Sequence, residues 1–131
     1  MENCINIWFM RQAGRYLPEY REIRKKKKNF IELCLSPKLA ADISLQPIER
    51  FNFDFIILFS DILVIPYALG QTVRFQEKVG PILGELNFDP LDLDINKKLE
   101  KLTPIYETIK KIKKSKKGKK LIGFCGGPFT V

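Results

Sequence analysis

The stretch Phe53-Asp-Phe-Ile-Ile-Leu-Phe59 decides the fold class of this 131-residue chain. It is short, almost wholly apolar and rich in β-formers, so it suits a strand that is buried on both faces. Strands of this kind occur in parallel sheets whose two faces are covered by helices. The stretch therefore predicts an α/β fold.

Two more apolar stretches are expected to form buried strands of the same sheet. They are Ile5-Asn-Ile-Trp-Phe-Met10 and Leu121-Ile-Gly-Phe-Cys125. A further pair of strands is expected on a loop, because Thr72-Val-Arg-Phe-Gln76 is followed by Gly80-Pro81 and Gly84. The chain thus predicts three buried strands and one small hairpin.

Helices are expected between these strands. The first covers Pro18 to Arg24, with proline at a tolerated position in the first turn. Ser36-Pro37 predicts the start of the second, because serine caps helices and proline suits the first helical position. That helix covers Lys38 to Phe51, and Pro47 should bend or break it. Thr103-Pro104 opens the third helix.

Polar residues directly follow two of the expected strands. Arg11 and Arg15 lie four residues apart, and the guanidinium fork binds carboxylates or phosphates in pairs. Gly14 between them allows close approach of the backbone to a ligand. The alternative is an exposed arginine pair in surface salt bridges. Asp61 is likewise open to two interpretations, a catalytic carboxylate or the cap of a helix that begins near Ile62.

Composition excludes several classes of protein. No stretch approaches the about 20 apolar residues of a membrane span, and the N-terminus lacks the features of a signal peptide, so a cytoplasmic location is expected. Cys4, Cys34 and Cys125 have no Cys-x-x-Cys spacing, and the chain has no histidine. We therefore expect no metal site and reduced thiols that act as small apolar side chains.

The net charge of +8 is concentrated in lysines, eleven of which lie between Lys97 and Lys120. The run Lys110 to Lys120 is a candidate for binding nucleic-acid phosphates. It lacks the interleaved aromatic residues and arginines that read bases. Ile105, Ile109 and Ile112 instead form an apolar stripe among the lysines, which favours a solvated helix face.

Three motifs resemble, in the same order, the signatures of the uroporphyrinogen decarboxylase family. They are Met10 to Arg21, Phe59 to Pro66 and Ile122 to Thr130, and Leu45 to Arg50 also fits. The resemblance implies a (β/α)8 TIM barrel, a fold of about 250 residues. Residues 1–131 would supply about three βα units of one truncated barrel domain, incomplete at the C-terminus and short at the N-terminus.

The resemblance also implies roles for named residues. The family removes carboxyl groups from the acetate side chains of uroporphyrinogen III without a metal or an organic cofactor. Asp61 would stabilise the transition state and contact the substrate. Further substrate-binding residues would be Arg11, Gln12, Ala13, Gly14 and Arg15, and Arg24 and Phe30 would border the substrate. The whole enzyme would be a homodimer with no membrane or specific nucleic-acid partner.

Later family residues, including a histidine, would lie beyond Val131, so we expect the isolated chain to be inactive. Tyr67, Gly127 and Phe129 depart mildly from the family pattern. Four alternatives stay open: an inactive remnant, a split enzyme completed by another polypeptide, a nucleic-acid-binding module through Lys110 to Lys120, and a related methyltransferase of the same barrel superfamily.

Overall fold

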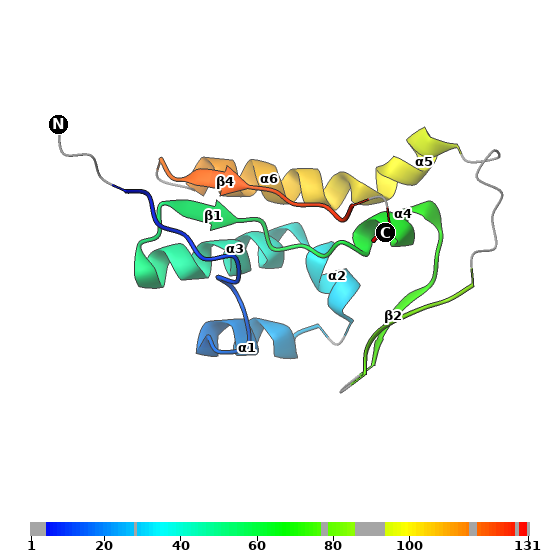
Figure 1. Ribbon diagram of the computed structural model, residues 1–131, viewed down its shortest axis with the longest axis horizontal. Coiled ribbons are helices and arrows are strands. Elements are labelled where there is room, and N and C mark those ends of the chain that lie inside the picture. Colours follow the sequence, from blue (N-terminus) through cyan, green and yellow to red (C-terminus); the bar gives the residue numbers. More distant parts are fainter. Residues whose placement is uncertain are drawn as a thin grey trace.

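The computed structural model describes residues 5–27, 29–76, 79–85, 94–115, 118–127 and 129–130. These residues form helices and two small sheets (Figure 1). Along the chain the elements are α1 (Pro18–Lys25), α2 (Phe30–Cys34), α3 (Pro37–Phe51), β1 (Phe55–Ile57), α4 (Val64–Leu69), β2 (Val73–Gln76), β3 (Gly80–Leu83), α5 (Ile95–Leu99), the 3-10 helix η2 (Glu100–Leu102), α6 (Thr103–Ser115) and β4 (Lys120–Ile122).

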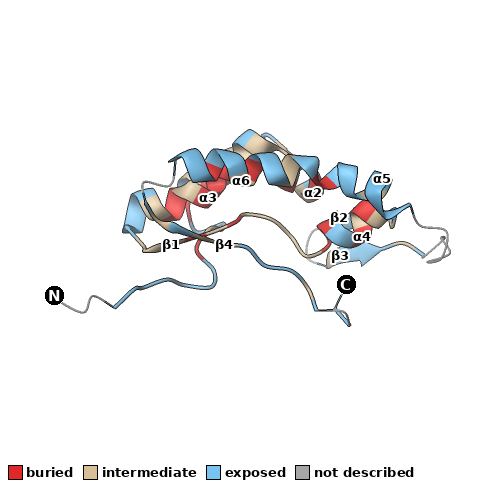
Figure 2. Ribbon diagram, turned by 90° about the horizontal axis from the view of Figure 1, so that it is seen from above, coloured by how far each residue is buried: buried red, intermediate tan, exposed pale blue. Residues whose placement is uncertain are grey.

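The pairing of β1 with β4 confirms the predicted parallel sheet. Phe55 lies opposite Lys120, and Ile57 lies opposite Ile122. The strands are shorter than expected, with three residues each. The prediction of burial on both faces is wrong: Ile56 is fully buried, but its neighbours are only half-buried. The reason is visible in Figure 2, where α3 and α6 lie on one side of β1 and β4 and none of the helices in the described part of the chain lies on the other.

The segment Ile5 to Met10 is not a strand, which corrects the first predicted one. It runs beside the start of β1, where Asp54 donates its backbone N–H to the Ile7 carbonyl oxygen at 3.1 Å. The Ile7 N–H, however, is bound at 2.8 Å by the Asp54 carboxylate. Because a side chain replaces the backbone partner, the ladder of backbone hydrogen bonds does not extend. The segment is also exposed, with Met10 at 79%.

Helix α3 is the central helix and packs against α1, α2, α6 and β1. The predicted start at Ser36-Pro37 is confirmed, although the Ser36 side chain makes no capping hydrogen bond. Pro47 was predicted to bend or break the helix, and it does not break it, since α3 continues to Phe51. Pro47 is among the most deeply buried side chains, and this packing offsets its missing N–H.

The predicted hairpin and helices are confirmed, but the predicted buried strand Leu121 to Cys125 is wrong in part: β4 ends at Ile122, and Phe124 and Cys125 are exposed. Strands β2 and β3 form the antiparallel hairpin, with Val73 opposite Leu83. Helix α1 covers the segment expected after the Arg11–Arg15 loop. Helix α6 turns its isoleucine stripe inward: Ile112 is fully buried in a core with Ile56 and Leu58, and Ile105 and Ile109 pack against that core. This core joins α3, β1 and α6.

Candidate functional site

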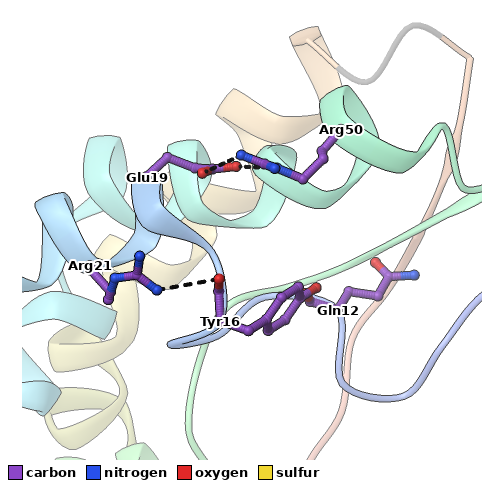
Figure 3. A network of polar contacts seen from close by, with 5 residues as sticks. All are labelled: Gln12, Tyr16, Glu19, Arg21 and Arg50. Atoms are coloured by element: carbon purple, nitrogen blue, oxygen red, sulfur yellow. Dashed lines mark hydrogen bonds and ion pairs between the residues drawn. The ribbon is translucent and has the colours of Figure 1, made fainter.

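The residues from Arg11 to Arg15, here called the Arg loop, connect the extended N-terminal segment to α1. The Tyr16 hydroxyl donates a hydrogen bond to the Gln12 backbone carbonyl. Arg21 of α1 donates through Nη1 to the carbonyl oxygen of Arg15 at 2.9 Å and to that of Tyr16 at 3.3 Å, the second of which Figure 3 shows. These bonds fix the backbone of the loop.

Gln12 is the buried member of the Arg loop, with 3% of its surface exposed. Its side-chain Nε2 donates to the Phe55 carbonyl oxygen at 3.1 Å. Its Oε1 has no hydrogen-bond partner among the described residues. Gln12 therefore ties the loop to β1 and keeps one acceptor unused.

The two arginines of the loop have exposed side chains. Within the described ranges, neither guanidinium forms a hydrogen bond or an ion pair. The alternative of a surface salt-bridge pair is therefore not what the structure shows. Arg11 and Arg15 remain able to bind an anion through all of their donors.

A salt bridge joins α3 to α1, the helix that follows the Arg loop. Arg50 donates from Nε and Nη2 to the two carboxylate oxygens of Glu19, each at 2.9 Å (Figure 3). The bidentate hydrogen bonds lower the pKa of Glu19 below its usual value and raise that of Arg50. The pair thus keeps the helix that follows the Arg loop in place.

Asp61 follows β1 at the carboxyl end of the strand. Its Oδ1 accepts the Leu63 backbone N–H at 2.8 Å, and its carbonyl oxygen accepts the Val64 N–H at 3.3 Å. Asp61 therefore does form the turn that leads into a helix, although α4 begins at Val64 and not near Ile62. Its Oδ2 has no hydrogen-bond partner in the described part of the chain. One carboxylate oxygen is structural, and the other is available.

Aromatic rings connect Asp61 to the other predicted site residues. The Phe59 ring contacts Phe30, with centroids 5.7 Å apart, and Tyr20, with centroids 6.0 Å apart. Ala13 of the Arg loop and Phe59 pack against the same buried cluster, which contains Tyr20. The Arg24 guanidinium carbon lies 5.8 Å from the Phe30 ring centroid. Phe30 and Ala13 thus pack with Phe59, which lies two residues before Asp61 in the sequence, and Arg24 lies against Phe30.

Charges of opposite sign meet around buried groups beside this cluster. Burial and the negative charge of Asp61 raise the pKa of the Cys34 thiol to about 12, while the positive charge of Arg24 acts against that rise. Burial likewise raises the pKa of Tyr20, and Arg24 and Arg15 partly oppose it. Asp61 and Arg24 thus act with opposite sign on Cys34, and Arg24 and Arg15 act on Tyr20.

The third motif, Ile122 to Thr130, has fewer contacts that place it relative to Asp61 and the Arg loop. Gly126 and Gly127 follow β4, whose carboxyl end lies at the same sheet edge as that of β1 because the strands are parallel. Phe129 is fully exposed, and Thr130 donates its N–H to the Gly127 carbonyl oxygen at 2.8 Å. Pro128 lies outside the described residues.

Sequence reasoning missed four residues that shape the site: Tyr20, Cys34, Ser44 and Phe59. Ser44 is fully buried on α3, and its Oγ accepts the Phe59 backbone N–H at 2.8 Å. Phe59 had a signal, since it directly precedes Ser60-Asp61. Nothing in the local sequence indicated that Ser44 would meet it, because the two residues are fifteen positions apart.

Other features of the chain have no role in this site. A surface hollow of about 560 Å³ is lined by Glu19, Asp42, Leu45, Gln46, Glu49 and Arg50.

The described lysines of α6 are exposed, and Lys116, Lys117 and Cys4 lie outside the described residues. Across the described ranges, no cluster of three or more acidic, cysteine or histidine side chains is arranged to bind a metal ion. No helix there has the length and apolarity to cross a membrane.

Comparison with known proteins gives a consistent result. The model of the uroporphyrinogen decarboxylase (URO-D) family matches residues 3–131. The uroporphyrinogen decarboxylase of Chelativorans sp. (strain BNC1) is 53% identical over 127 residues. Those of Brucella ovis and Brucella anthropi are 51% and 52% identical over the same length. Each match covers 95% of this chain and 37% of the relative. The chain belongs to the uroporphyrinogen decarboxylase family.

Proposed function

We propose that this chain carries the Asp61 and Arg-loop half of a uroporphyrinogen decarboxylase site, which converts uroporphyrinogen III to coproporphyrinogen III. The single observation that carries the proposal is geometric: two residues before Asp61, the Phe59 ring contacts Tyr20 and Phe30, and the Arg24 guanidinium carbon lies 5.8 Å from the Phe30 ring centroid. Family membership gives this arrangement its chemistry, because all of these residues lie within the matched range.

Asp61 is the proposed catalytic residue. Loss of CO₂ from an acetate arm leaves an electron pair that needs an acceptor, and a pyrrole ring protonated on carbon supplies one. A fixed carboxylate beside the ring stabilises that positive charge as it develops. The unpaired Oδ2 of Asp61 is suited to this role, because Oδ1 is already bound to Leu63. The substrate provides its own electron sink, so no metal or organic cofactor takes part.

The Arg loop is the proposed carboxylate-binding element. The substrate carries eight carboxylates, which suit the unpaired guanidinium groups of Arg11 and Arg15. Ala13 and Gly14 contribute backbone groups, and the Oε1 of Gln12, which has no partner among the described residues, can accept a hydrogen bond from a pyrrole N–H but cannot bind a carboxylate. Arg24 and Phe30 border the bound tetrapyrrole. The loop orients the substrate, and Asp61 acts on its ring.

The same proposal covers the whole protein. Residues 1–131 form part of one (β/α)8 barrel domain, in which β1 and β4 are neighbouring strands and helices such as α3 and α6 lie outside. The support for this is the parallel pairing with helices on one face. The whole protein acts as a cytoplasmic homodimer on a tetrapyrrole, without a membrane or specific nucleic-acid partner.

A chimeric enzyme tests the function. The matched 37% of the Chelativorans relative is replaced by this chain, and formation of coproporphyrinogen III from uroporphyrinogen III is measured. We expect turnover by the chimera. Asp61→Asn should lower kcat by about 10²-fold or more, because the amide removes the charge that stabilises the transition state. Asparagine keeps an oxygen that can accept the Leu63 N–H, so the turn is preserved.

Asp42→Asn is the matched control. It makes the same chemical change at an exposed aspartate of α3, and turnover should stay at the level of the unsubstituted chimera. A folded chimera that gives no product would contradict the proposed function. Full activity of the Asp61→Asn chimera would contradict the role of Asp61.

A further inference from the structure

We propose that Ser44 is a positioning residue of the decarboxylase site, which fixes the place of Asp61 through the backbone of Phe59. The inference rests on the proposed function and adds to it a residue that contacts neither Asp61 nor the Arg loop in any described hydrogen bond. Its basis is the geometry of one buried hydroxyl.

Both hydrogen-bonding roles of the Ser44 hydroxyl are used. Oγ donates to the Ala40 carbonyl oxygen at 2.8 Å, one turn earlier in α3. It accepts the Phe59 N–H, also at 2.8 Å. A hydroxyl has one donor and two acceptor lone pairs, so donation to Ala40 directs the proton away and leaves a lone pair for Phe59. The residue is 1% exposed, so water does not offer an easy substitute.

The Phe59 N–H lies one residue beyond Leu58, the last described amide of this segment that is hydrogen-bonded to β4. Leu58 still donates to the Ile122 carbonyl oxygen of β4 at 2.9 Å. The next backbone donor, that of Phe59, is taken by Ser44 instead. Ser44 therefore continues the support of the backbone for one residue beyond the ladder.

The segment that carries Asp61 is consequently held at both ends. At its start, the Phe59 amide is bound by Ser44, and the Phe59 ring is packed between Tyr20 and Phe30. At its end, Asp61 is bound by the Leu63 N–H. Loss of the Ser44 contact should let Phe59 shift, and the Asp61 turn should shift with it.

Thr108 provides a matched comparison on α6. Its Oγ1 donates to the Pro104 carbonyl oxygen at 2.9 Å, one turn earlier in its helix, and it is also 1% exposed. Unlike Ser44, it accepts no hydrogen bond from any backbone amide in the described ranges. Thr108→Val thus removes a buried hydroxyl that makes the same bond within its helix as Ser44 but lacks the second bond to a backbone amide.

The test is amide hydrogen exchange of the 131-residue chain, measured residue by residue by NMR. In Ser44→Ala, the exchange rates of the Phe59 and Leu63 amides should rise about tenfold more than those of the other core amides, because the Phe59 amide loses its acceptor. Ser44→Thr keeps the hydroxyl and should restore slow exchange. Thr108→Val should change core amides evenly, with no excess at Phe59 or Leu63.

The chimeric enzyme gives the second readout. There Ser44→Ala should lower kcat by about tenfold with a smaller change in KM, and Ser44→Thr should recover the loss. Unchanged exchange at Leu63 in Ser44→Ala would overturn the inference, as would failure of Ser44→Thr to restore it. The exchange measurement needs no substrate, so an inactive chimera would count against the proposed function alone.

Discussion

Gln12 donates its side-chain amide to the carbonyl oxygen of Phe55 at 3.1 Å, which bonds the Arg loop to the first residue of β1. The two residues are 43 positions apart in the sequence. Asp61 follows the other end of the same strand. The two halves of the proposed site are thus attached to one short strand, and each depends on β1 for its place.

Removal of this bond should destabilise the chain. Gln12→Met keeps the length of the side chain and should lower the free energy of unfolding by about 1–2 kcal/mol, because the Phe55 carbonyl loses its donor. Gln12→Glu should cost more at pH 7, since it buries a carboxylate against a carbonyl oxygen. Urea unfolding at pH 7 and pH 4 measures both. An equal effect of the two substitutions at pH 7 would show that Gln12 is not buried as described.

The Glu19–Arg50 salt bridge should make stability depend on pH in acid. Because its folded pKa is lowered, Glu19 contributes stability above its unfolded pKa, and that contribution is lost as the pH falls through the folded value. Glu19→Gln should therefore lower the melting temperature at pH 7 but have little effect near pH 3. A drop of the same size at both pH values would mean that the charge of Glu19 is not involved.

Cys34 should be an unreactive thiol in the folded chain. Its pKa is raised from an ordinary 9.0 to about 12, so at pH 8 alkylation should be on the order of 10³-fold slower than for an ordinary thiol. Iodoacetamide labelling followed by peptide mass spectrometry should modify the exposed Cys125 first. The free energy of unfolding should also fall as the pH rises from about 9 towards 12, because over this range the thiol ionises in the unfolded chain but stays neutral in the folded chain. Rapid native labelling of Cys34 would contradict its burial.

Asp61 should have a structural role that is separable from its chemistry. Asp61→Ala removes the acceptor of the Leu63 N–H and should cost about 1 kcal/mol in unfolding free energy. Asp61→Asn keeps an acceptor and should cost less. Thermal unfolding of the two variants compares them directly. If both were equally destabilised, the charge of Asp61 and not its hydrogen bond would support the turn.

The 131 residues alone should not produce coproporphyrinogen III. They span 37% of the relatives' length, and the apolar segment before the Arg loop is exposed. An assay of the purified chain with uroporphyrinogen III measures this. Product formation that disappears in Asp61→Asn would refute the prediction.

The sequence alone predicted the elements whose signals are local. The Ser36-Pro37 start of α3, the β2–β3 hairpin and the stripe Ile105, Ile109 and Ile112 depend on neighbouring residues, and all were confirmed. The motifs around Arg11 and Asp61 also identified the family before any comparison. Such features follow from turn chemistry and periodicity, which short segments carry by themselves.

Tertiary structure decided the rest. The carboxylate of Asp54 prevents the segment around Ile7 from extending the sheet, and burial of Pro47 keeps α3 continuous. Contacts between residues distant in the chain, such as Gln12 with Phe55 and Ser44 with Phe59, set the geometry of the site. No local pattern encodes them, because a hydrogen bond between distant residues exists only after helices and strands have packed.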